Sequence, residues 1–221
     1  MIEWLASPRR PRKQPAAWLL NLADEELRQS ALSIPPSEAD LARAAGRPAA
    51  ERKDVLVRRG LVRLCVAAAL GVAAAEIGIS WTAGGAPQLA PPFADLHLSW
   101  AQRQGRFVCA LARAPIGVDV EIADGGEIPW NVLHPDEAAL LRGAIISERE
   151  ALFLRIWAAK EAYAKALGEG FRRDPSSFVV RLQGASGVID DPALRGPGPT
   201  EIAFAPIAHI EAIAAVAMLA S

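Results

Sequence analysis

The sequence has little lysine, few cysteines and almost no net charge. Of its 24 basic residues only four are lysine, and the formal net charge is −1. This balance gives no general positive field, so we expect no nucleic-acid partner. Cys65 and Cys109 lie in separate apolar runs without metal-type spacing. They therefore predict buried thiols in a reducing compartment rather than a disulfide or a zinc site.

Long hydrophobic runs are also missing. The longest, residues 64–75, is well short of the roughly 20 residues that a membrane-spanning helix needs. A basic cluster at 9–13 precedes an apolar segment, but acidic residues follow it at once, unlike in a signal peptide. We therefore expect a soluble cytoplasmic protein without membrane attachment, and a solvated basic tail.

The order of the predicted elements indicates an α+β fold. Apolar periodicity predicts helices at 37–45, 51–70 and 147–167, and a further helix that begins at Pro135. Apolar segments bounded by turn residues predict strands at 15–22, 76–81, 95–100, 107–112, 116–121, 176–182, 200–207 and 210–219. We expect the strands at 107–112 and 116–121 to form an antiparallel hairpin. Ser147 with Glu150 has the spacing of a capping box, and Gly168 is placed to end that helix.

Two carboxylates share one face of the strand IGVDVEI. Because side chains alternate along a strand, Asp119 and Glu121 lie opposite the four apolar residues Ile116, Val118, Val120 and Ile122. One interpretation is a strand with a solvated outer face. The other is a pair of ligands for a cation.

A third carboxylate and a lysine come from the helix in WAAKEAYAKALGEG. Phe153, Trp157, Glu161 and Lys165 follow at four-residue spacing and form one row on that helix. Taken alone, Glu161 and Lys165 make an ordinary surface pair. Together with Asp119 and Glu121, however, they suit Mg²⁺, which prefers oxygen ligands and takes others from substrate phosphate. A lysine beside such a site can meet phosphate as a compact point charge.

The two motifs at this separation resemble the 4′-phosphopantetheinyl transferase superfamily, whose members carry a G(I/V)D(I/V)E segment followed by a W/F-x-x-KE-x-x-x-K helix. GVDVE and WAAKEAYAK match that pattern, and the following GEGFRRDPSSFVVRL resembles the family's Gly-x-Gly stretch and the strand after it. The length is similar to the larger, surfactin-synthetase-activating type. That resemblance implies two similar α/β subdomains in one chain, with an N-terminal half at 1–114 and a C-terminal half at 115–221.

The resemblance implies Mg²⁺-dependent transfer of the 4′-phosphopantetheinyl group from coenzyme A to a serine of an acyl- or peptidyl-carrier protein. Asp119, Glu121 and Glu161 would hold Mg²⁺, and Glu161 would also be the base. Lys165 would steady the phosphate charge, while Lys160 would contact the donor or position its helix. The two-half architecture also implies a monomer.

The first half departs from the family pattern at the expected donor contacts. Trp100 follows Ser99 where histidine is usual, Ala86 precedes Pro87 where a basic residue is common, and Asp54 aligns with an expected arginine. The remaining donor-binding candidates here are Ser99, with Arg52 and Lys53 beside Asp54. These departures predict a weakened pocket for the adenosine 3′-phosphate. They leave open a different pyrophosphate-linked donor or acceptor, or a non-catalytic homologue that binds carrier proteins.

Overall fold

The computed structural model describes residues 2–12, 15–168, 172–194, 199–207 and 212–219. Lys13 of the basic cluster, Glu169–Phe171 of the GEGF stretch and the predicted strand start at 210–211 lie outside these residues. None of the helices within these ranges combines the length and the apolar character needed to cross a bilayer.

The first sheet has four strands in the order β1-β2-β6-β5. They are β1 (Glu3–Leu5), β2 (Ala16–Asn21), β6 (Arg106–Ala112) and β5 (His97–Arg103), with β1 and β2 parallel and the other pairs antiparallel. Its outer face is covered by α1 (Glu25–Leu32), α2 (Glu38–Ala45) and α3 (Ala49–Leu70), and beside it lies a short hairpin of β3 (Ile79–Trp81) and β4 (Pro87–Leu89). A capping box of Ser37 and Asp40 starts α2.

The second sheet has five antiparallel strands in the order β7-β11-β10-β9-β8. They are β7 (Ile116–Ile122), β11 (Ala212–Met218), β10 (Thr200–Pro206), β9 (Ser186–Asp190) and β8 (Val179–Gln183). α4 (Pro135–Gly143) and α5 (Ile146–Leu167) lie on its outer side, and short 3₁₀ turns occur at Ala74–Glu76, Trp130–Val132 and Pro175–Ser177.

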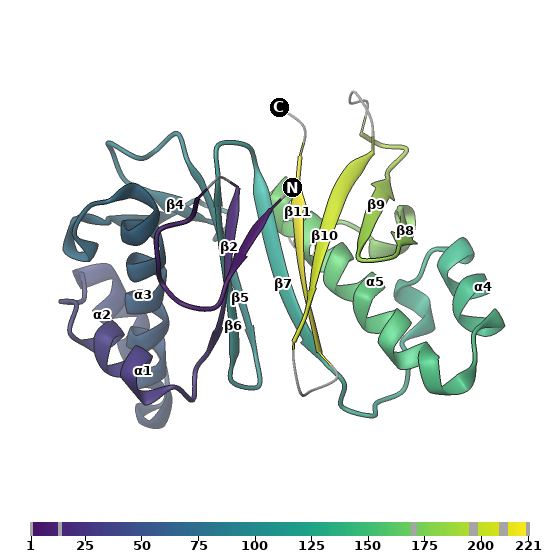
Figure 1. Ribbon diagram of the computed structural model, residues 1–221, viewed down its shortest axis with the longest axis horizontal. Coiled ribbons are helices and arrows are strands. Elements are labelled where there is room, and N and C mark those ends of the chain that lie inside the picture. Colours follow the sequence, from purple (N-terminus) through teal and green to yellow (C-terminus); the bar gives the residue numbers. More distant parts are fainter. Residues whose placement is uncertain (1, 13–14, 169–171, 195–198, 208–211, 220–221) are drawn as a thin grey trace.

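The two sheets face each other between the two sets of helices, so the molecule has four layers (Figure 1). Val118 and Val120 of β7 pack in one buried cluster with Val108 and Ala110 of β6. Separate clusters join each sheet to its own helices. This mixed arrangement confirms the α+β class. That the two halves are similar stays a prediction.

Two local predictions are wrong. The strands at 107–112 and 116–121 do not form a hairpin, because β6 pairs with β2 and β5 whereas β7 pairs with β11. The residues between them therefore cross from one sheet to the other. Ser147 does not cap α5 either. The helix begins at Ile146 without a side-chain cap, and Glu150 Oε1 instead accepts hydrogen bonds from the backbone N–H groups of Asp124 and Gly125.

The sequence interpretation also missed α1, which is a short amphipathic helix that follows β2 closely. Asp24 caps it through hydrogen bonds from the N–H groups of Glu26 and Leu27. The later boundaries were predicted better: α4 begins at Pro135, and Gly168 ends α5 in the left-handed conformation with φ 71°.

Candidate active site

β7 and α5 approach so closely that only glycine fits at their crossing. A Cβ added at Gly117 would lie 1.9 Å from Ala162 O and 2.4 Å from Ala166 N. Real Cβ atoms do not approach backbone atoms this closely, so the glycine sets the spacing between the strand and the helix. The close crossing places the carboxylates of β7 against the row of polar residues on α5.

The carboxylates of β7 are covered, not solvated. Asp119 is 6% exposed and Glu121 is 7% exposed, so the interpretation of a water-facing strand is wrong. Lys165 Nζ lies 2.6 Å from Asp119 Oδ1, and Arg103 Nε lies 3.0 Å from Glu121 Oε2. Lys165 therefore pairs across to the strand, rather than with Glu161 on its own helix.

Burial and mutual repulsion make these carboxyl groups hard to ionise. Burial first, and then the charge of Asp119, raise the pKa of Glu121 to about 7, although Arg103 opposes the shift. Burial also raises the pKa of Asp119, with Lys165 opposing it, and the pKa of Glu161. Glu161 interacts electrostatically with both Asp119 and Glu121. The structure thus brings the three predicted carboxylates within range of one another.

The side chains stand as carboxylate–cation pairs rather than as an assembled metal cage. Among the described residues, no three His, Cys, Asp or Glu side chains are grouped as ligands of a single ion. Lys165 pairs with one carboxylate oxygen of Asp119, and Arg103 pairs with one carboxylate oxygen of Glu121. Asp119 Oδ2, however, is buried without a hydrogen-bond partner. A buried carboxylate oxygen without a partner is costly unless a cation or a donor reaches it.

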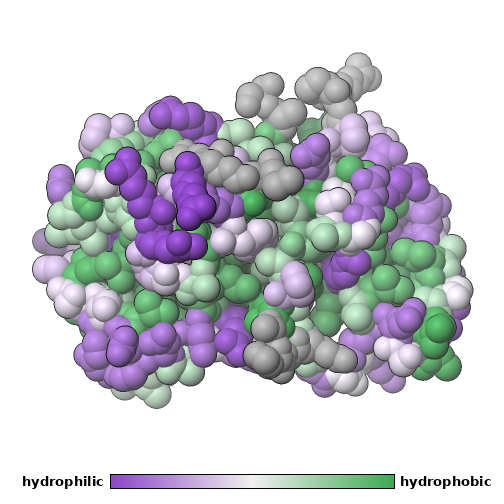
Figure 2. Space-filling model, in the orientation of Figure 1, coloured by the Kyte–Doolittle hydropathy of each residue, from purple (hydrophilic) through white to green (hydrophobic). Residues whose placement is uncertain are grey.

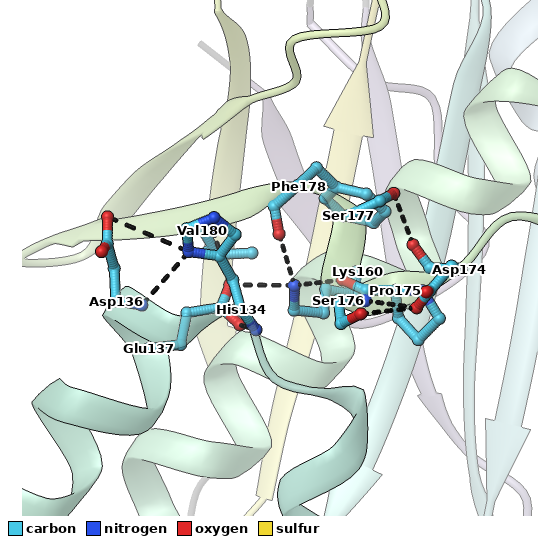
Figure 3. Close-up of polar contacts among 10 residues, drawn as sticks. All are labelled: His134, Asp136, Glu137, Lys160, Asp174, Pro175, Ser176, Ser177, Phe178 and Val180. Carbon is cyan, nitrogen blue, oxygen red and sulfur yellow. Dashed lines mark hydrogen bonds and ion pairs between the residues drawn. The ribbon is translucent and has the colours of Figure 1, made fainter.

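Lys160 has a structural position, beside Glu137 and the carbonyls of Pro175 and Phe178 (Figure 3). Its side chain is 1% exposed, and Nζ lies 2.9 Å from Glu137 Oε1. The same ammonium donates hydrogen bonds to the carbonyls of Pro175 and Phe178, at 2.6 and 2.8 Å. Of the two roles predicted for Lys160, the contacts support positioning of the helix.

Glu137 completes this buried cluster. Its Oε1 accepts a hydrogen bond from the N–H of Val180, and its Oε2 accepts one from the N–H of His134. The Lys160–Glu137 pair thereby ties α5 to α4 and to the start of β8 (Figure 3). The lysine of the KE motif thus holds the helix that presents Glu161 and Lys165.

A cleft of about 260 Å³ opens beside Lys165. It lies among α2, α3, the β3–β4 turn, β5 and the end of α5, and its lining consists of Arg43, Arg59, Trp81, Gly84, Gly85, Ala86, Pro87, Leu98, Ser99, Trp100, Lys165 and Gly168. Its walls bring together two tryptophans, two arginines and one lysine. This composition suits a ligand with both an aromatic part and anionic groups.

The predicted donor residues divide into those that reach the cleft and those that do not. Ser99 lines it, and its Oγ also accepts a hydrogen bond from the N–H of Val118 at 3.2 Å, which joins the two sheets. Arg52 and Lys53 are exposed in the first turns of α3 and are not among the described residues of the lining. Arg43 and Arg59 line it instead. Periodicity could have pointed to Arg59, which lies on the buried side of α3.

Comparison with known proteins agrees with the site. Residues 115–194 match the family model described as the 4′-phosphopantetheinyl transferase superfamily. The matched range contains β7, α5 and all three predicted carboxylates. This part of the chain is similar to that superfamily.

Three relatives with similar sequences are each named as 4′-phosphopantetheinyl transferases. The chain is 30% identical over 125 residues to the 4′-phosphopantetheinyl transferase of Bacillus subtilis, a match that covers 56% of this chain and 55% of that protein. It is 29% identical over 164 residues to the 4′-phosphopantetheinyl transferase HetI of a Nostoc species, covering 71% of this chain and 69% of the relative. A third relative is the 4′-phosphopantetheinyl transferase gsp of Aneurinibacillus migulanus, 29% identical over 39% of this chain and 37% of that protein. The match thus spans little more than half of the Bacillus subtilis protein.

Proposed function

We propose that the protein transfers the 4′-phosphopantetheinyl group of coenzyme A to a serine hydroxyl of an acyl- or peptidyl-carrier protein. The observation that carries this proposal is the grouping of Asp119, Glu121, Glu161 and Lys165 at the crossing of β7 and α5, beside a cleft for the donor. The family match over the same residues supports it.

In the proposed reaction, the serine oxygen attacks the phosphorus that bears the pantetheine arm. The bond from that phosphorus to the bridging oxygen breaks, and 3′,5′-ADP leaves with the bonding electron pair. Glu161 accepts the serine proton, and its raised pKa brings it closer to the range in which a carboxylate is an effective base. Lys165, whose side chain is 31% exposed, faces the cleft and stabilises the negative charge on the phosphate.

The carboxylates fit Mg²⁺ by the chemistry of their oxygens. Asp119 Oδ2 lacks a partner in the interior, and Glu121 shares Arg103 with the exposed Asp124. Asp119, Glu121 and Glu161 would hold the ion. When bound, Mg²⁺ supplies positive charge to the pyrophosphate and makes 3′,5′-ADP a better leaving group.

The test is transfer to an apo carrier protein with Mg²⁺, measured by the intact mass of the carrier, in matched glutamate variants. Glu161→Gln should reduce transfer by at least about 100-fold because it removes a positioned base. Glu148→Gln, which changes an exposed residue of the same helix, should transfer at the wild-type rate. Equal rates in both variants would refute the role of Glu161.

A further inference from the structure

Arg103 lies between a carboxylate of the proposed metal group and a carboxylate outside it. It stands at the end of β5, and its side chain is 40% exposed. Nε lies 3.0 Å from Glu121 Oε2, and Nη2 donates a hydrogen bond of 3.1 Å to Asp124 Oδ2. One guanidinium therefore contacts a carboxylate that the proposed function assigns to Mg²⁺ and a second carboxylate that it does not.

The two contacts of Arg103 differ in kind. The bond to Asp124 is a directed hydrogen bond. The contact with Glu121 is one of charge alone, because Nε is buried and has no hydrogen-bond partner among the described residues. A charged donor that lies near an acceptor without good alignment gains less than an aligned one. Arg103 is therefore held more firmly at Asp124 than at Glu121.

Asp124 is a fixed anchor for the arginine. Its backbone N–H donates to Glu150 Oε1 of α5, and its Oδ1 accepts a hydrogen bond from the N–H of Gly126. Its Oδ2 accepts from Arg103. The Asp124 side chain is half-exposed, so the guanidinium loses little hydration when it pairs there. The loop after β7 thus offers Arg103 a partner outside the metal group.

The charges of the group decide which cation yields to a metal ion. The three carboxylates face two cations, Lys165 and Arg103. A divalent ion adds two positive charges there, and each cation already present opposes its binding. Lys165 pairs with Asp119 inside the group, whereas Arg103 also has Asp124 outside it. Arg103 is therefore the cation that can move without losing its carboxylate partner.

The surroundings of Arg103 leave room for this movement. Arg103, Glu121 and Asp124 all line a hollow of about 260 Å³ between the loop after β7 and α5. Among the described residues, this hollow shares no lining residue with the cleft beside Lys165. The arginine can thus turn toward Asp124 without entering the donor cleft.

We propose that Arg103 competes with Mg²⁺ for Glu121 and passes to Asp124 when the ion binds. Arg103 is thus a positioning residue that lowers the affinity of the site for the ion, and Asp124 offsets part of that loss. The inference rests on the proposed function, which assigns Asp119, Glu121 and Glu161 to Mg²⁺. It adds that the occupancy of the site depends on an arginine and a carboxylate that are not ligands.

The test measures Mn²⁺ binding without coenzyme A, by the electron paramagnetic resonance signal of the free ion. Mn²⁺ suits the same carboxylate oxygens as Mg²⁺. Arg103→Met should bind Mn²⁺ roughly 5-fold more tightly than the wild-type protein, which is the upper range for a partly exposed ion pair. Arg113→Met is the matched control, because Arg113 forms an exposed ion pair with Asp95, and it should bind Mn²⁺ as the wild-type protein does.

A second pair of variants separates competition from the general effect of charge. Asp124→Asn keeps the oxygen that accepts from Gly126 but weakens the anchor, so Arg103 stays at Glu121 and Mn²⁺ should bind about 3-fold more weakly. When Asp124→Asn is added to Arg103→Met, the affinity should change by less than about 2-fold, because the coupled partner is already gone.

Each outcome decides for or against the inference. If Arg103→Met binds Mn²⁺ no more tightly than the wild-type protein, the competition is refuted while the metal site stands. If Asp124→Asn weakens binding equally with and without Arg103, Asp124 acts on the ion itself, and the movement of Arg103 is wrong.

If no protein of the set binds Mn²⁺, the inference fails together with the metal assignment of the proposed function. Circular dichroism establishes whether each variant folds. Should Arg103→Met not fold, the comparison of Asp124→Asn with the wild-type protein decides the question, and equal affinities of these two proteins would refute the inference.

Discussion

Two lysines of α5, five residues apart, lie in opposite surroundings. Lys160 is enclosed with Glu137 and two backbone carbonyls, whereas Lys165 is 31% exposed and faces the cleft. Their sequence surroundings are alike, since both follow small apolar residues in one helical motif. The difference comes from the helix face on which each lysine lies: one face meets α4 and β8, and the other meets β7.

This difference predicts separate effects of matched substitutions. Lys160→Met should lower the free energy of unfolding by about 3–5 kcal/mol, because it leaves the buried Glu137 without its counter-ion. Lys165→Met should reduce phosphopantetheinyl transfer by at least about 100-fold, because it removes charge stabilisation at the phosphate. Urea denaturation and the transfer assay measure the two effects. A Lys160→Met protein of normal stability would contradict the buried pair.

The pKa of Glu121 predicts how the stability of the metal-free protein depends on pH. Folding raises this pKa from its ordinary value of 4.5 to about 7, so the folded state holds the proton more strongly than the unfolded state. The resulting stabilisation is present at low pH and is lost as the pH rises from about 4.5 to 7. Glu121→Gln should show a smaller loss of unfolding free energy over that range. Parallel losses in both proteins would show that Glu121 is not the source.

At the level of single residues, the sequence predicted which side chains share a face of an element, but not which other parts of the chain contact them. The alternation in IGVDVEI placed Asp119 and Glu121 on one face of the strand correctly, because strand geometry alone decides it. The sequence could not show that α5 covers that face. Nor could it show that Arg59 lies between two tryptophans, because these contacts join residues far apart in the chain.

At the level of elements, the crossing of β7 and α5 determines whether the site exists. Gly117 allows the strand to touch the helix backbone at Ala162 and Ala166. The hairpin prediction was wrong because short links favour antiparallel neighbours, whereas here the three residues 113–115 carry the chain from one sheet to the other. The strand that bears the carboxylates therefore begins the second sheet.

Gly117→Ala tests this crossing. The added methyl group would overlap Ala162 O, so the helix must move, and we expect a loss of more than about 2 kcal/mol in unfolding free energy together with reduced transfer. Gly143→Ala is a suitable control, because a Cβ there has nothing within 4 Å and Gly143 does not have a positive φ. Equal stability of the two variants would show that the helix does not depend on Gly117 for its position.

At the level of the whole molecule, the proposed site needs both sheets. The carboxylates and Lys165 come from β7 and α5. The two tryptophans come from β5 of the first sheet and from β3, and the two arginines of the cleft come from α2 and α3. The bond from the N–H of Val118 to Ser99 Oγ joins these parts next to the cleft. At the α4 end, hydrophobic residues reach the surface (Figure 2), among them Leu140, Ile145 and Ile146.

The most direct measurement is the intact mass of apo carrier proteins of the fatty-acid, polyketide and peptide-synthetase classes after incubation with this protein, coenzyme A and Mg²⁺. We predict that at least one carrier gains the mass of one phosphopantetheinyl group on its serine, and that removal of Mg²⁺ with EDTA prevents the gain. A known 4′-phosphopantetheinyl transferase in parallel samples shows that each carrier is competent. If the known enzyme modifies all the carriers and this protein modifies none, the proposed transfer is contradicted.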